Sequence, residues 1–135
     1  MFTHCTRPQA VGMIHPVENR CVNLQTLEAL RSFQEEGQPD FLTELIDTYL
    51  NDSPQRLENL RQAVTEGDMT AVSRAAHAWK GSSGNLGAEN LSRLLYQIEL
   101  AAKSGDNKAV SDSFWEAETE FQSVKKFLGD QRRPA

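Results

Sequence analysis

The chain is 135 residues long, with 39% hydrophobic and 24% charged residues, which predicts one globular domain around a single core. Nowhere do about 18 apolar residues follow one another, which argues against a membrane-spanning helix. The net charge of −5 argues against nucleic acid as the main partner, because binding nucleic acid depends on neutralising its phosphates.

Both ends of the chain lack helical periodicity. Residues 1–21 contain no apolar block, so they predict a flexible arm rather than a secretory signal. Residues 130–135 are expected to form a flexible tail, which leaves residues 22–129 for the folded domain. The spacing of Cys5 and Cys21 matches no zinc or redox motif, so we expect two free thiols and a cytoplasmic protein.

Two helices are predicted in the first half of the domain. Asn23 is a suitable N-cap for a short helix that ends before Gly37. Asp40 precedes a longer apolar stripe that keeps spacings of three and four residues past Pro54. Because a loop would normally break this register, we expect one long helix kinked at Pro54, with two helices meeting at that point as the alternative. The stripe residues are Leu24, Leu27, Leu30 and Phe33, then Leu42, Ile46, Leu50, Ser53, Leu57, Leu60 and Val64.

Three further helices are predicted in the second half. Gly67 ends the long helix, and Asp68 is the expected N-cap of the next one, which Gly87 closes. Gly105 separates the last two helices, and Gly129 is the expected end of the final one. The stripes are Val72, Ala76, Trp79, Ser83 and Leu86; Leu91, Leu94, Leu95, Ile98 and Ala102; and Val110, Phe114, Ala117, Phe121, Val124 and Leu128.

The arrangement of these helices predicts an all-α fold. No segment alternates with period two, as a half-buried strand would. Four long amphipathic helices joined by short links fold most simply as an antiparallel up-down four-helix bundle, with the short additional N-terminal helix covering one end. We expect a monomer, because the apolar stripes are narrow enough to be buried in one core.

Core packing does not explain four residues of the helix predicted between Asp68 and Gly87. His77, Lys80, Gly81 and Gly84 lie about 100° around the helix from the buried positions, on an adjoining and more exposed face. Each glycine inside a helix costs roughly 1 kcal/mol relative to alanine. What glycine offers in return is a bare backbone that another surface can approach closely.

This set of side chains is suited to carrying a phosphoryl group. A neutral imidazole is a good nucleophile, and a lysine three residues later can place its ammonium beside whatever bonds to the ring. Phosphoryl transfer needs little beyond positioning and electrostatic stabilisation. These residues therefore suit a histidine, His77, that carries phosphate between proteins, with the Lys80 ammonium offsetting the charge of the phosphoryl group. Because the Lys80 charge is screened by water on a partly exposed face, we expect it to contribute less than about 1 kcal/mol to stability.

The run from His77 to Ala88 resembles the H-x-x-K-G-S-S-x-x-L-G-A signature of histidine-containing phosphotransfer domains. The resemblance extends over residues 23–128 in the number and order of helices, although Pro54 and the N-terminal arm lie outside the signature. It implies that His77 accepts a phosphoryl group from an aspartate on a receiver domain of a hybrid sensor kinase and passes it to a response regulator. It also implies that Lys80 helps to position the phosphoryl group and that Gly81 permits docking. The Mg²⁺ for transfer would belong to the receiver, so no cofactor is expected here.

The receiver-docking face is expected to include Ser73, Arg74, Gly81 and Gly84, with Arg74 and Lys80 attracting the acidic pocket of the receiver. The chain would then be a stoichiometric phosphocarrier and not an enzyme. The main alternative is a binding module that docks and titrates a receiver or kinase without relaying phosphate. A weaker one is the phospho-accepting module of a histidine kinase.

Other chemistries fit the residues poorly. The glycines follow Lys80 rather than precede a lysine, and no strand comes before them, which excludes a P-loop. Ser82 and Ser83 have no acid and second histidine nearby for a triad, so packing and helix-end hydrogen bonds are expected for them. His4, His15 and His77 lack metal-ligand spacing. The glutamates that a di-iron bundle would need are expected to lie on solvated helix faces; these are Glu99, Glu116, Glu118 and Glu120.

Overall fold

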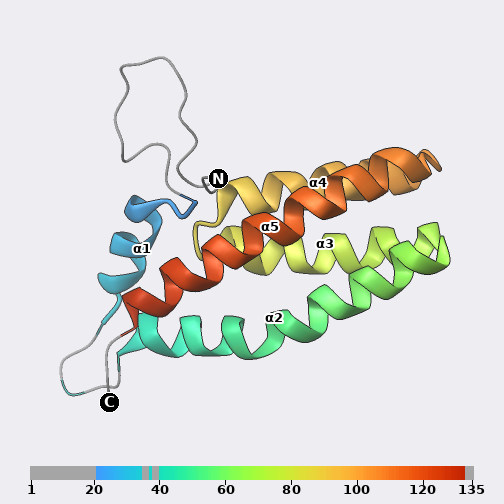
Figure 1. The fold of residues 1–135 in the computed structure, drawn as a ribbon. Helices are drawn as coiled ribbons and strands as arrows, with labels where there is room; N and C mark the ends of the chain where they lie inside the picture. The colour runs from blue at the N-terminus through green and yellow to red at the C-terminus, as the bar shows by residue number, and fades with distance from the viewer. Residues whose placement is uncertain (1–20, 35–36, 38–39, 133–135) are drawn as a thin grey trace, which may run out of the picture.

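The computed structural model describes residues 21–34, 37 and 40–132, and within these ranges the chain forms five α-helices and no strand. The helices are α1 (Leu24–Arg31), α2 (Phe41–Glu66), α3 (Met69–Asn85), α4 (Glu89–Lys103) and α5 (Asn107–Gln131). The four long helices run alternately up and down, and α1 lies at the end of the bundle where α2 begins and α3 ends (Figure 1). None of the helices in the described ranges is both long and apolar enough to cross a membrane.

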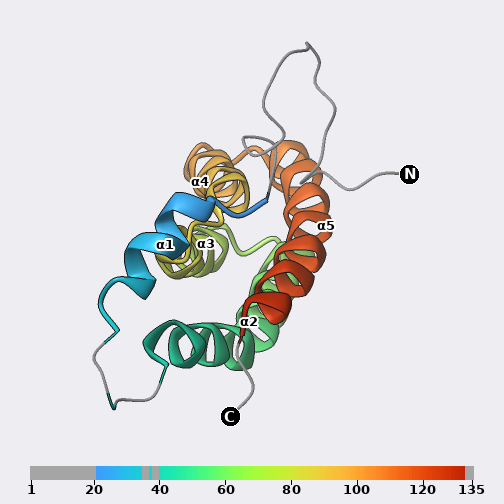
Figure 2. The ribbon, with the colours of Figure 1, turned by 90° about the vertical axis from the view of Figure 1, so that its left-hand side faces the viewer.

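The four long helices surround one core. Each packs against two neighbours, α3 against α2 and α4, and α5 against α4 and α2, as the view along the bundle shows (Figure 2). At its centre the Trp79 ring meets the Phe121 ring edge-on, 5.1 Å between centroids, and Tyr49 meets Phe121 in the same way at 6.3 Å. The predicted stripe residues of α3, α4 and α5 are all buried, which confirms the helical periodicity on which the bundle was predicted.

The helix ends follow their sequence signals. The side chains of Asn23, Asp68 and Asp106 accept hydrogen bonds from backbone N–H groups in the first turns of α1, α3 and α5. Gly67 ends α2 with a φ of 71°, in the left-handed region where glycine carries no penalty. Gly87 is confined as well, because a Cβ there would lie 3.0 Å from the backbone oxygen of Asn23, where α1 starts against the α3–α4 turn.

Helix α2 continues through Pro54, as predicted, and does not divide there into two helices. Proline has no N–H to donate to the carbonyl four residues earlier, which weakens the helix locally, and the axis of α2 bends along its length (Figure 1). Ser53, the polar member of the stripe, is buried because its Oγ accepts a hydrogen bond of 3.2 Å from Trp79 Nε1. The polar residue therefore keeps the stripe in register without leaving a buried indole N–H unsatisfied.

The structure differs from the expected boundaries at both ends of the domain. Cys21, assigned to the arm, is buried beside the core, and the rest of the predicted arm lies outside the described residues. Helix α5 passes Gly129 and includes Asp130 and Gln131, and the Gln131 side chain accepts a hydrogen bond of 3.1 Å from Arg31 of α1. Phe33 was expected in the stripe of the first helix, but α1 ends at Arg31 and Phe33 is exposed.

Candidate functional site

The outer face of α3 presents His77 near the middle of the helix. Val72, Ala76, Trp79 and Ser83 are buried on the adjoining inner face, which fixes how the helix is rotated. The His77 side chain is 67% exposed, so its ring is open to a partner over much of its surface. The helix rotation thus follows from the apolar stripe alone.

Helix α4 places a buried carboxylate behind this histidine. The Glu99 side chain is only 7% exposed, and its Oε2 lies 3.1 Å from His77 Nδ1. Its other oxygen, Oε1, accepts a hydrogen bond of 2.9 Å from Lys80 Nζ. Lys103 Nζ, one turn further along α4, donates to Oε2 at 3.2 Å. Glu99 is therefore shared by three nitrogen-bearing side chains of α3 and α4.

These contacts orient the imidazole. An ionised carboxylate only accepts hydrogen bonds, so His77 Nδ1 carries the proton in this pair, which leaves the Nε2 lone pair available. Burial by itself raises the pKa of Glu99, but hydrogen bonds from Lys80 and Lys103, together with the charge of Lys80, outweigh burial and hold this pKa below its ordinary value. Glu99 therefore stays ionised at neutral pH, and Nε2 is the nitrogen that can act as a nucleophile.

Lys80 is more enclosed than its predicted place on an exposed face suggests. Its side chain is 25% exposed, and its ammonium contacts both Glu99 and the ring of Tyr96, with Nζ 4.7 Å from the ring centroid. Because His77 and Lys80 both contact Glu99, the ammonium lies on the same side of α3 as the imidazole Nδ1. The structure thus brings the two predicted chemical residues together through a third that was not predicted.

The two glycines of α3 lie in different environments. A Cβ built on Gly81 would meet no atom within 4 Å, so nothing inside the described fold requires glycine there. A Cβ built on Gly84 would lie 3.3 Å from Ser92 Oγ of α4, and Ser92 itself donates a hydrogen bond to the Lys80 carbonyl. Close packing between α3 and α4 therefore accounts for Gly84, whereas Gly81 faces open space.

The remaining predicted residues of α3 divide between its two flanks. Ser73 and Arg74 line a hollow between α3 and α4, opposite Lys103. Ser83 is buried and shares a hydrogen bond of 2.7 Å with the Tyr49 hydroxyl, and Ser82 Oγ donates to the Trp79 carbonyl. Burial raises the pKa of Tyr49 to about 12 in spite of its hydrogen bond with Ser83. Both serines have the packing and hydrogen-bonding roles that the sequence predicts.

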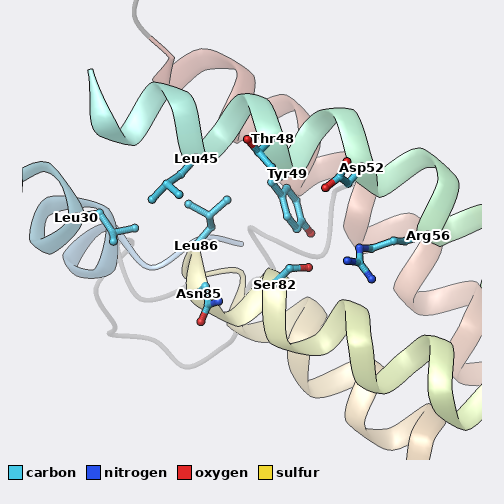
Figure 3. Close-up of a pocket in the computed structure, with 9 residues that line it drawn as sticks. All are labelled: Leu30, Leu45, Thr48, Tyr49, Asp52, Arg56, Ser82, Asn85 and Leu86. Carbon is cyan, nitrogen blue, oxygen red and sulfur yellow. The ribbon is translucent and has the colours of Figure 1, made fainter. Parts of the chain in front are cut away.

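A second hollow of about 390 Å³ lies on the other flank, between α1, α2 and α3. Figure 3 shows Leu30, Leu45 and Leu86 together at one end and Arg56 extending from α2 at the other. Ser82 and Asn85 form its α3 wall, so this hollow adjoins the helix face that carries Gly81. One apolar end and one charged end make it a suitable recess for a protein side chain.

The prediction that four glutamates lie on solvated faces is wrong for two of them. Glu99 and Glu120 are buried, whereas Glu116 is exposed and Glu118 is partly exposed and paired with Arg61. Glu120 is buried because it is spaced three residues from Ala117 and four from Val124, along the core stripe of α5. No group of three His, Cys, Asp or Glu side chains in the described ranges is arranged to hold a metal ion.

Comparison with known proteins gives a consistent result. The family model of the Hpt domain matches residues 44–126. Histidine-containing phosphotransfer protein 2 of Arabidopsis thaliana is 25% identical over 104 residues, which cover 75% of this chain and 67% of that protein. The phosphorelay intermediate protein rdeA of Dictyostelium discoideum is 26% identical over 98 residues, which cover 73% of this chain and 39% of that protein.

A solved structure has the same arrangement of helices. The histidine-containing phosphotransfer protein B (HptB) of Pseudomonas aeruginosa PAO1 superposes with a TM-score of 0.75 and 29% identity. The superposition covers 82% of this chain and 93% of that one. The fold and the family comparison therefore agree over the four long helices.

Proposed function

The chain belongs to the Hpt domain family and has a histidine phosphotransfer role in two-component signalling, and from this premise we propose that His77 is the residue that carries the phosphoryl group. The observation that carries the proposal is the hydrogen bond of 3.1 Å between His77 Nδ1 and the buried carboxylate of Glu99, with Lys80 on the same carboxylate. This contact engages Nδ1 of an exposed imidazole and would leave Nε2 available to a partner.

The proposed transfer begins with the Nε2 lone pair attacking the phosphorus of a phosphorylated aspartate on a receiver domain. The P–O bond to the aspartate breaks, its electron pair leaves with the carboxylate, and a P–N bond forms at Nε2. The Nδ1 proton stays hydrogen-bonded to Glu99, which stabilises the positive charge that the ring acquires. Lys80 offsets the negative charge of the phosphoryl group. Attack by an acceptor aspartate on the same phosphorus reverses these steps.

Gly81 lies at the centre of the proposed docking face. The open space above it supports this role, because the fold itself gives no reason for glycine there. Ser73 and Arg74 extend the face along α3, and the hollow beside Asn85 adds an apolar recess on the α2 side. We assign Gly84 to the rim of this face, since it is only partly exposed and packs against Ser92.

The donor in this proposal is the receiver domain of a hybrid sensor kinase, and the acceptor is a response regulator. The protein acts in this proposal as a stoichiometric carrier, in which one nucleophile, His77, accepts a single phosphoryl group and returns it. We further propose that it works in the cytoplasm as a monomer; light scattering at micromolar concentration would then give 15.1 kDa, and twice this mass would contradict a monomer.

The test is phosphorylation by candidate hybrid kinases with labelled ATP. We expect an acid-labile, base-stable label on the unmodified protein and on His4→Gln and His15→Gln, but not on His77→Gln. A label that persists in His77→Gln would refute the assignment. If the protein binds the receiver but takes no label, the non-relaying binding module is the better description.

A further inference from the structure

Tyr96 is a large aromatic side chain that remains 47% exposed on α4, beside the site. It lies three residues before Glu99, so the two side chains share one face of the helix. Lys80 Nζ lies 4.7 Å from the centroid of the Tyr96 ring and 2.9 Å from Glu99 Oε1. The ammonium is therefore held by two neighbouring groups of α4, a carboxylate and an aromatic face.

We propose that Tyr96 is a positioning residue for phosphotransfer, whose ring keeps the Lys80 ammonium within reach of a phosphoryl group on His77. The proposal rests on the proposed function. A distance below about 6 Å to the ring centroid is that of a cation–π contact, which attracts the ammonium without a directional hydrogen bond.

The two holders of Lys80 respond differently to phosphorylation. Glu99 competes with the phosphoryl group for the same ammonium, because both are anions that accept its N–H donors. The Tyr96 ring does not compete in this way, since the ammonium can turn its N–H groups toward the phosphoryl oxygens while it stays over the ring. Tyr96 would thus hold the Lys80 ammonium both before and after transfer, whereas Glu99 would hold it only before the phosphoryl group arrives.

Docking should strengthen the contact with the ring. Water competes for an ammonium that is partly exposed, and a cation–π contact gains strength when water is removed. A receiver that covers His77 and the adjoining face of α4 would shield both Tyr96 and Lys80 from solvent. The ring should therefore matter more for transfer from a receiver than for labelling by a small phosphodonor.

A double-mutant cycle tests this role. Tyr96→Leu should slow transfer from a phosphorylated receiver about two- to fivefold, and Tyr96→Phe, which keeps the ring, should stay within twofold of the unmodified protein. In a Lys80→Met background, Tyr96→Leu should have no further effect, because the ring then has no ammonium to hold. The ε-methylene proton resonances of Lys80 should carry a ring-current shift that Tyr96→Phe retains and Tyr96→Leu abolishes.

Each outcome has a defined meaning. If the unmodified protein takes no label, the proposed function fails, and the role of Tyr96 fails with it. If the protein is labelled at His77 but Tyr96→Leu transfers at the normal rate, only the role of Tyr96 is refuted. An equal slowing by Tyr96→Leu with and without Lys80 would also refute it, because the ring would then act on docking or packing rather than on the ammonium.

Discussion

Replacing Gly81 by glutamine separates the stability of α3 from the docking of a partner. A Cβ at this position meets no atom within 4 Å, so the new side chain enters solvent without strain. Glutamine is a good helix former and glycine a poor one, and the exchange should add about 0.5–1 kcal/mol to the free energy of unfolding. For a domain of this size that gain raises the melting temperature by about 2–4 °C.

The same substitution should impair transfer from a receiver. An added side chain in a close contact typically costs about 1–3 kcal/mol, which corresponds to a drop of about 5- to 150-fold in transfer efficiency. Labelling of His77 by phosphoramidate needs no docked surface and should change little. The assays are thermal unfolding followed by circular dichroism, stopped-flow transfer from a phosphorylated receiver, and ³¹P NMR of the phosphoramidate reaction.

Gly129→Gln is the matched control. Gly129 also lies in a helix with no atom within 4 Å of an added Cβ, but it belongs to the last turn of α5. The Gly129→Gln substitution should leave transfer from a phosphorylated receiver unchanged. If Gly81→Gln unfolds the protein, the space above Gly81 is not open; if it accepts phosphate from a receiver at the normal rate, the docking face lies elsewhere on the bundle.

Three further predictions concern the residues around Glu99 and the core beneath α3. Lys80→Met should slow transfer about 10- to 100-fold in stopped-flow measurements. It should cost about 1–2 kcal/mol in urea unfolding, more than the sequence predicts because Lys80 is partly enclosed, but not more because Glu99 keeps its contacts with Lys103 and His77. A large loss of stability with normal transfer would reverse this assignment. Glu99→Ala should slow transfer and let ¹⁵N NMR detect both neutral tautomers of His77, and a single Nδ1–H tautomer would show that another group orients the ring. Burial raises the pKa of Tyr49 to about 12, so between pH 10 and 12 the folded protein binds more protons than the unfolded chain. The free energy of unfolding should therefore fall by about 2–3 kcal/mol as the pH rises through this range. Tyr49→Phe should abolish this fall when unfolding is measured at both pH values.

The helices and the two chemical residues follow from local patterns. Stripes spaced by three and four residues determine which face of each helix is buried, and the cap residues mark the ends. His77 and Lys80 share a face by spacing alone, and continuation of the stripe past Pro54 correctly predicted one helix there. These inferences need only the geometry of a single helix.

The rest depends on how helices pack against one another. Spacing along the helix places Gly81 and Gly84 on the same exposed face of α3, and only the approach of Ser92 from α4 distinguishes their environments. Glu99 was assigned to solvent together with three other glutamates once a di-iron site was rejected, and its partners His77 and Lys80 come from another helix. A signal was nevertheless present, since Glu99 follows Leu95 by four residues and therefore borders the apolar stripe of α4.

The residues with proposed chemical roles all belong to one hairpin of two consecutive helices. His77 and Lys80 on α3, and Tyr96, Glu99 and Lys103 on α4, lie within a continuous segment that ends at Lys103. Helices α1 and α2 contribute the walls of the recess beside this hairpin but no group to the carboxylate cluster. The part of the proposed docking face on α3 shares this hairpin with the reacting residues, but the α1 and α2 walls of the recess lie in a separate stretch of the gene. Mutations in those walls would therefore alter partner recognition while every residue of the carboxylate cluster is inherited unchanged.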